Sequence, residues 1–127
     1  MGEYSKALEY YEKDLDIMKK ALPSTHPHLA MSYNNIGAVY NDMGEYSKAL
    51  EYYEKDLDIM KEALPPAHPD LASSYSCIGK VHKNMGEYSK ALPLLEKALS
   101  IRLKSLPSTH PHIKSVLNAI ARVKEKF

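Results

Sequence analysis

One segment of this sequence is present twice without a single change. The letters MGEYSKALEYYEKDLDIM begin at Met1 and again at Met43, and a looser third copy begins with MGEYSKAL at Met85, so the spacing is 42 residues both times. A fixed period of this size is typical of stacked repeats, in which each unit is one supersecondary element that buries its apolar face against its neighbours. We therefore expect a single repeat domain over residues 1–127, with units 1–42, 43–84 and 85–126.

Each unit contains one long and one shorter amphipathic helix. In the first unit the apolar residues recur in alternating steps of four and three from Tyr4 to Leu22, and Pro23 ends this pattern. The shorter helix begins at Pro27, a residue suited to a first helical turn, and ends before Gly44, which can adopt the left-handed conformation that closes a helix. The pattern predicts an all-α fold of antiparallel hairpins with six helices, at residues 3–22, 27–42, 45–64, 69–84, 87–106 and 111–126.

Glycine and proline also occur inside the predicted helices. A glycine within a helix costs roughly 1 kcal/mol relative to alanine, so the recurrence of Gly37 as Gly79 indicates that a neighbouring helix crosses too close there for a side chain. Pro93 lies within the fifth predicted helix, and we expect it to bend that helix or to delay its start.

Composition excludes several classes of function. The formal net charge is +1, with 17 basic and 16 acidic residues, so the chain lacks the overall basic field that nucleic acid or an anionic membrane would require. No apolar run approaches the ~20 residues needed to span a bilayer. The single cysteine, Cys77, excludes an internal disulfide and fits a reducing compartment. We expect a cytoplasmic protein that binds neither nucleic acid nor membrane.

Seven positions around the turn after each of the first two shorter helices recur in register. The first set is Tyr33, Ile36, Gly37, Tyr40, Gly44, Tyr46 and Ala49, and the second is Tyr75, Ile78, Gly79, His82, Gly86, Tyr88 and Ala91. The chain therefore resembles a tetratricopeptide-repeat array, and its 42-residue period is similar to the variety found in kinesin light chains and nephrocystin-like arrays. The resemblance implies a right-handed superhelical solenoid that acts as a protein-binding scaffold. The family usually has a small residue where Asp14 and Asp56 stand, and only Ala98 follows that pattern.

The differences between the first two units gather on one side of the shorter helix. Only eleven positions differ between residues 1–42 and residues 43–84, and the first nineteen residues are identical. Six of the eleven fall within about a third of the circumference of the shorter helix. An exposed stripe can drift because nothing constrains it, but drift alone would also have changed the exposed charges of the long helix, such as Glu9 and Glu12. The pattern therefore favours a ligand-facing stripe.

This stripe predicts a peptide-binding groove, because a stacked array curves and its inner helices line the concave side. Asparagine carries both a donor and an acceptor, so it can bond the backbone of an extended peptide regardless of sequence. The resemblance implies a role for Asn35, because kinesin-light-chain-like repeats have an asparagine at this position that binds the peptide. The basic residues lie toward the C-terminal half, which favours a partly acidic peptide and binding that weakens with salt. The predicted groove residues are Asn34, Asn35, Asn41, Ser76, Lys80, Lys83, Asn118 and Arg122.

Metal binding and catalysis find little support in the sequence. The histidines sit mainly in three linkers separated by whole units, and no Cys/His cluster supplies a closed set of four ligands. We interpret His26, His68 and His110 as linker residues that begin the next helix. Cys77 has no nucleophile motif around it, and the chain has no glycine-rich phosphate loop. We expect no metal, no cofactor and no enzyme activity.

The two ends of the chain suggest a second hypothesis, self-association. The chain starts with a long helix whose shorter partner is missing and ends with a shorter helix whose long partner is missing, so the two ends are complementary, although the last helix is polar like a cap. Stacking one copy on another would be a heterologous contact that does not close on itself, giving filaments or swapped oligomers. The predicted self-association face of the opening helix consists of Tyr4, Leu8, Tyr11 and Leu15.

Overall fold

The computed structural model describes residues 2–127, and every regular element in this range is a helix. The prediction of an all-α fold with six helices is confirmed. The helices are α1 (Gly2–Ala21), α2 (Pro27–Asp42), α3 (Tyr46–Ala63), α4 (Pro69–Asn84), α5 (Tyr88–Leu103) and α6 (Pro111–Lys124).

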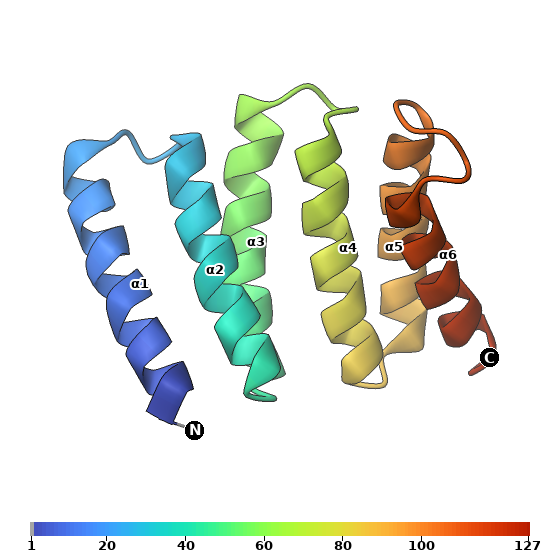
Figure 1. Cartoon of the computed structure of the whole chain (residues 1–127), viewed down its shortest axis with the longest axis horizontal. Helices are drawn as coiled ribbons and strands as arrows, with labels where there is room; N and C mark the ends of the chain where they lie inside the picture. The colour runs from blue at the N-terminus through green and yellow to red at the C-terminus, as the bar shows by residue number, and fades with distance from the viewer. Residues whose placement is uncertain (1) are drawn as a thin grey trace. The chain divides into compact units, whose positions relative to one another are not determined.

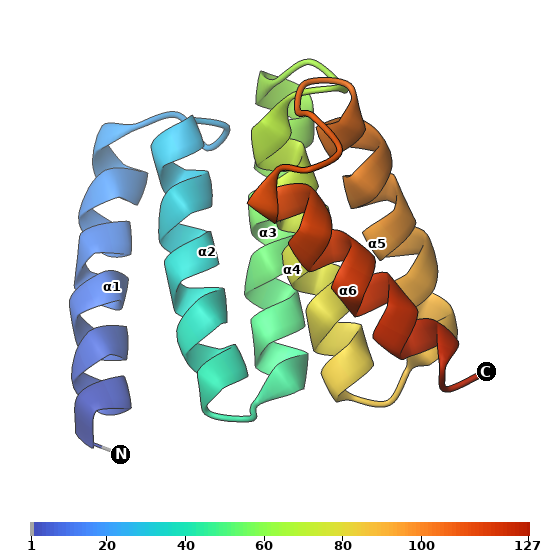
Figure 2. The same ribbon diagram turned by 45° about the vertical axis from the view of Figure 1, so that its right-hand side comes forward.

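By its internal contacts the chain divides into two compact parts, residues 1–63 and residues 64–127. From here on, unit 1 and unit 2 denote these two parts and not the 42-residue repeats. Unit 1 contains α1, α2 and α3, and unit 2 contains α4, α5 and α6. In unit 1, α2 packs against both α1 and α3, and the three helices run in alternating directions (Figure 1, Figure 2). In unit 2, α5 packs against both α4 and α6, again with alternating directions.

Each shorter helix begins with the same cap. His26, His68 and His110 are the N-cap residues of α2, α4 and α6, each with extended backbone and followed by a proline in the first turn. In each cap the imidazole Nδ1 accepts a hydrogen bond from the backbone N–H two residues later, at 3.1 Å. This bond satisfies one of the N–H groups that the first turn leaves without a partner. The histidines therefore begin the helices, as the linker pattern predicts.

The turns that follow α2 and α4 require glycine. Gly44 and Gly86 have φ angles of 80° and 79°, in the left-handed region that a side chain disfavours. After α2, the N–H of Glu45 donates to the carbonyl of Tyr40 at 2.9 Å, and the N–H of Gly44 donates to the carbonyl of Asn41 at 3.0 Å. These bonds close the helix and turn the chain directly into α3, as expected for a glycine at this position.

At the two helical glycines a side chain of the paired helix packs directly on the backbone. A Cβ atom on Gly37 would lie 2.9 Å from a ring carbon of Tyr53, and one on Gly79 would lie 3.0 Å from the Leu95 side chain. The close crossing predicted for Gly37 and Gly79 is confirmed. Pro93 does not delay α5, which begins at Tyr88, and its side chain is exposed.

Candidate functional site

Four of the five predicted groove residues of unit 2 converge on one cleft. Lys80 and Lys83 of α4 line a cleft of about 580 Å³ together with one face of α6. The residues that α6 contributes are Pro111, Lys114, Ser115, Asn118, Ala119 and Arg122. We call this the basic cleft. Four predicted residues, Lys80, Lys83, Asn118 and Arg122, thus share one site.

The basic cleft contains positive charge without a counter-charge of its own. Among the described residues, no acidic side chain lines it. Within residues 2–127, Lys80, Lys83, Lys114 and Arg122 form neither an ion pair nor a side-chain hydrogen bond. The chain as a whole is nearly neutral, so this charge is a local property of the cleft.

Lys83 is affected both by burial and by the positive charges around it. Its side chain is half-buried, and burial lowers its pKa from the usual value, with further lowering from the positive charges of Arg122 and Lys80. Burial and the neighbouring positive charges therefore disfavour the charged form of Lys83, and a nearby anion would stabilise that form.

A second cleft adjoins the first through shared residues. It has a volume of about 410 Å³ and is lined by Lys83, Tyr88, Arg122, Glu125 and Lys126. Glu125 is the only carboxylate that lines either cleft among the described residues. The shared Lys83 and Arg122 make the two clefts one basic surface on unit 2.

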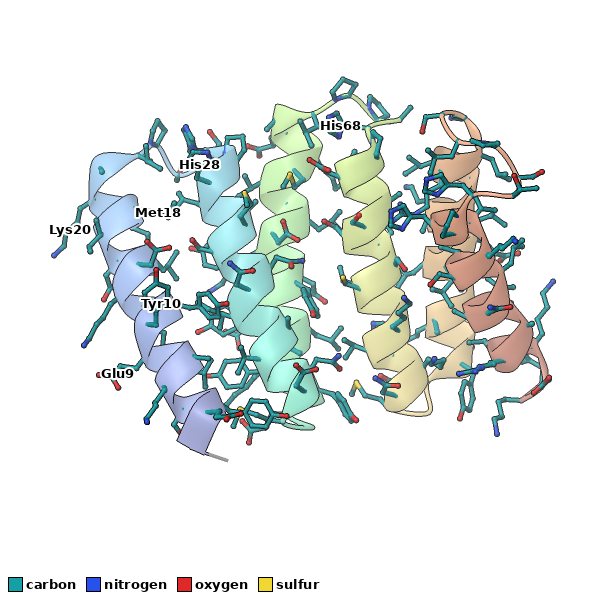
Figure 3. All side chains as sticks on the ribbon, in the orientation of Figure 1. Glu9, Tyr10, Met18, Lys20, His28 and His68 are labelled. Atoms are coloured by element: carbon teal, nitrogen blue, oxygen red, sulfur yellow. The ribbon has the colours of Figure 1, made fainter. Side chains whose placement is uncertain are left out.

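In unit 1 the predicted residues have different surroundings from one another. Asn35 is exposed and lines a shallow cleft of about 260 Å³ between α1 and α2, together with Asp14, Met18, His28, Met31 and Ser32. Figure 3 shows Met18 and His28 on the facing sides of these two helices. Asn41 is half-buried near the end of α2.

Asn34 is held inside the α2–α3 hairpin. It is half-buried, and its side-chain amide donates to the Asp56 carboxylate at 3.2 Å. Asp56 is only 2% exposed. This contact explains why an aspartate can replace the family's small residue there, since Asn34 supplies a donor to the buried carboxylate. Sequence reasoning noted Asp56 as a departure but missed its partner, which lies 22 positions away.

The structure corrects two of the predicted placements. Ser76 is 5% exposed, so its side chain does not reach the surface of a groove. Leu15 is 7% exposed and belongs to the core, because α1 packs with this side against α2. Tyr4, Leu8 and Tyr11 are half-buried. The exposed apolar residues of α1 are Tyr10 and Ile17, at 69% and 67%.

A buried arginine was also missed. Arg102 of α5 is 9% exposed, and its Nη2 donates to the Ser73 hydroxyl of α4 at 3.1 Å. The equivalent positions in the earlier copies are Met18 and Met60. The sequence shows that arginine replaces methionine at this position, but it does not show that the arginine side chain is buried.

Comparison with known families identifies the repeat. Tetratricopeptide-repeat models match residues 1–62 and residues 71–112. The chain belongs to the tetratricopeptide-repeat family. Members of this family generally act as non-catalytic scaffolds for protein–protein interaction. No curated protein matches the sequence.

Solved structures relate this tetratricopeptide-repeat array to kinesin light chains. The kinesin light chain protein of Podospora anserina with nearly identical repeats is 27% identical, with a TM-score of 0.90 over 98% of this chain and 59% of that chain. BtubC (BKLC) from P. vanneervenii has the same TM-score at 20% identity, with 98% of this chain and 50% of that chain covered. The N-terminal domain of stress-induced protein-1 from C. elegans is 19% identical, with a TM-score of 0.60 over 91% of this chain and 75% of that chain. The last two show the fold alone, and this array spans about half to three-fifths of the first two proteins.

None of the helices formed by residues 2–127 combines the length and the apolar character needed to cross a lipid bilayer. Within the same residues, no three His, Cys, Asp or Glu side chains are grouped as a metal ion would require.

Proposed function

We propose that this tetratricopeptide-repeat chain binds an extended, partly acidic peptide segment of another protein, and that the acidic part lies in the basic cleft of unit 2. The observation that carries the proposal is the convergence of Lys80, Lys83 and Arg122 on one open cleft without an acidic side chain. An acidic side chain placed there would gain Coulomb attraction from several cations at once.

The cleft also offers hydrogen-bonding groups that suit a peptide backbone. Ser115 and Asn118 lie on the same face of α6 as Arg122, and both are exposed. A side-chain amide can donate to a backbone carbonyl and accept from a backbone N–H, so recognition does not depend on the peptide's side chains. Asn35 provides the same chemistry in unit 1, whereas the amide of Asn34 is already engaged by Asp56. We therefore assign peptide contact to Asn35 in preference to Asn34.

The test is a peptide selected by display against the intact chain, followed by binding measurements with variants. Lys80→Ala plus Lys83→Ala should weaken binding about tenfold or more, because charge-assisted contacts are lost. Affinity for the unmodified chain should also fall as salt is raised. The matched control is Lys6→Ala plus Lys20→Ala, which removes the same charge from exposed positions of α1. Unchanged binding in the cleft variant, with its helix content intact, would show that the peptide binds elsewhere.

We also propose that the chain has no catalytic activity of its own and works in the cytoplasm. The family's general role as a scaffold supports the first point. The single cysteine, in a chain of 127 residues, supports the second.

Exposed apolar residues on α1 and α6 favour a second candidate, self-association. Tyr10 and Ile17 of α1 are exposed, whereas the identical residues Tyr52 and Ile59 of α3 are half-buried and buried. Leu117 of α6 is also 45% exposed. A helix from a second copy could cover Tyr10 and Ile17 as α2 covers Tyr52.

The contact between α6 and α1 would differ from that of α2 with α3. Helix α6 carries Ala121 at the position of Gly37, and α1 carries Tyr11 at the position of Tyr53. A Cβ on Gly37 would lie 2.9 Å from the Tyr53 ring, so Ala121 would force the Tyr11 ring of the other copy to move.

Light scattering over a wide concentration range decides between the candidates, and a monomer at every concentration removes self-association.

A further inference from the structure

The basic surface of unit 2 carries more positive charge than an ordinary acidic side chain can balance. Its two clefts bring together five cationic residues and one carboxylate, that of Glu125. The cationic residues are Lys80, Lys83, Lys114, Arg122 and Lys126. A single Asp or Glu of a bound peptide would bring one negative charge to this site.

The cations are close enough to affect one another. Burial lowers the pKa of Lys83, and the charges of Arg122 and Lys80 lower it further. Like charges that already repel one another gain more from a ligand with two negative charges on one group than from a carboxylate with one.

We propose that the basic cleft binds the phosphate of a phosphorylated serine or threonine side chain in the partner peptide. This inference rests on the peptide-binding function proposed above and names the group that the cleft selects. A phosphate monoester carries about −1.5 to −2 charges at pH 7 and three strong acceptor oxygens.

The chemistry of the lining residues matches such a group. Arg122 offers a planar fork of N–H donors, which suits two oxygens of one phosphate. Lys80 and Lys83 act as compact charges from the opposite helix, α4. Ser115 and Asn118 lie on the same face as Arg122 and can donate to a remaining oxygen.

The same residues argue against the phosphates of a nucleic acid. The cationic residues of the two clefts belong to α4, to α6 and to the residues directly after α6, and the chain as a whole has a net charge of +1. Among the residues that line the clefts, only Tyr88 has an aromatic ring. Binding of a single strand would need a longer basic track and several rings for base stacking. The surface fits one phosphoryl group better than a phosphate backbone.

The experiment uses three pools of short peptides with randomised flanking residues and a fixed central serine, glutamate or phosphoserine. Binding to the full chain is measured by fluorescence polarisation at constant ionic strength. The phosphoserine pool should bind about tenfold more tightly than the glutamate pool, and the serine pool most weakly, since one further charge-assisted hydrogen bond is worth about that factor. Inorganic phosphate should compete with the phosphoserine pool, and acetate at equal ionic strength should not.

Lys80→Gln plus Arg122→Gln should abolish the difference between the phosphoserine and glutamate pools. Lys6→Gln plus Lys20→Gln, which removes the same charge from α1, should preserve it. Circular dichroism checks that both variants keep their helix content, and Lys83→Gln alone, at a half-buried position, provides a milder second variant.

Each outcome bears on a different proposal. Equal binding of the phosphoserine and glutamate pools, lost in the cleft variant, would overturn the phosphate inference and leave the peptide function in place. Failure of all three pools to bind would overturn both. Competition by a single-stranded oligonucleotide as effective as that of the phosphopeptide pool would overturn the assignment to a phosphorylated side chain.

Discussion

The hairpins α2–α3 and α4–α5 share their backbone design and differ in what fills the space between the helices. Both begin with a histidine cap, both cross at a glycine and both turn through a left-handed glycine. In α2–α3 the ring of Tyr53 packs on Gly37, and Asn34 donates to Asp56. In α4–α5 the side chain of Leu95 packs on Gly79. Ser76 and Ala98 occupy the positions of Asn34 and Asp56.

The turn ends of the two hairpins differ in the same way. In α2–α3 the Tyr40 ring stacks on Tyr52 with centroids 5.6 Å apart, and Lys48 lies 5.4 Å above Tyr40. In α4–α5, His82 replaces that tyrosine and forms a hydrogen bond with Glu87 at 3.1 Å. One contact is common to both: a lysine lies over the first tyrosine, Lys55 over Tyr33 and Lys97 over Tyr75.

The comparison separates what the hairpin requires from what it tolerates. Cap, crossing glycine and turn glycine recur because they set the backbone path, which has few alternatives. The interior can be aromatic and polar or mainly aliphatic, provided that the volume is filled and buried polar groups have partners.

The largest predicted effect concerns the buried polar pair of α2–α3. Asn34→Ala should destabilise this hairpin by about 1–3 kcal/mol, because the buried Asp56 carboxylate loses a donor. Asn34→Ala combined with Asp56→Ala should recover much of the loss, since it also removes the buried carboxylate, which Ala98 replaces in α4–α5. Urea unfolding gives the energies, and amide hydrogen exchange assigns them to residues 27–63. Additive losses in the double variant would mean that the pair is not coupled.

The crossing glycines should respond unequally to alanine. Alanine gains roughly 1 kcal/mol in helix propensity, whereas overpacking typically costs 1–3 kcal/mol. Gly37→Ala should be net destabilising by about 1 kcal/mol, because the rigid Tyr53 ring lies in the way. Gly79→Ala should cost less, since the Leu95 side chain can change rotamer. Replacing Tyr53 by leucine in the Gly37→Ala background should remove the difference, and thermal unfolding would measure it.

The histidine caps should contribute equally to the two hairpins. His26→Ala and His68→Ala should each cost about 1 kcal/mol, the usual effect of losing an N-cap acceptor. Serine at the same positions should restore most of this, because its hydroxyl can accept the same backbone N–H. Hydrogen exchange in the first turn of α2 and of α4 is the readout. A much smaller loss at one site would show that packing of the following proline, rather than the imidazole acceptor, starts that helix.

The smallest effect is a pH dependence confined to α4–α5. Hydrogen bonds from His82 and Lys90 lower the pKa of Glu87 below its usual value. A lowered pKa in the folded state means that Glu87 contributes stability above the usual glutamate range, which is lost as pH falls through the folded-state pKa. Between about pH 5 and pH 3, unfolding of the unmodified chain should therefore depend more on pH than that of Glu87→Gln. Glu45→Gln in α2–α3 is the matched control, and an equal response of both variants would contradict the assignment.

The sequence predicts the fold better than the site. Period, caps and glycines are local signals, so the helix type, the hairpin crossing and the left-handed turns at Gly44 and Gly86 all follow from spacing. Burial depends on partners distant in sequence, which explains why Ser76 and Leu15 were placed at the surface. The change of methionine to Arg102 and the pairing of Asn34 with Asp56 likewise needed the packed helices. Arg122 could be linked to Lys80 because the two occupy the same position in the repeat. Asn118 and Lys83 occupy other positions on the same stripe of the shorter helix.

Helices α1 and α3 share an identical stretch, residues 4–19 and 46–61, but have different neighbours, as the exposed Tyr10 and the stacked Tyr52 illustrate. Intrinsic helix propensity is therefore equal along this segment, and a difference between the two copies in amide exchange or tyrosine nitration, measured beyond the first turn, reports the surroundings of each helix. The molecule thus contains an internal reference for separating the intrinsic helix propensity of a segment from the effect of its surroundings. The two copies give that comparison within a single sample, without any substitution.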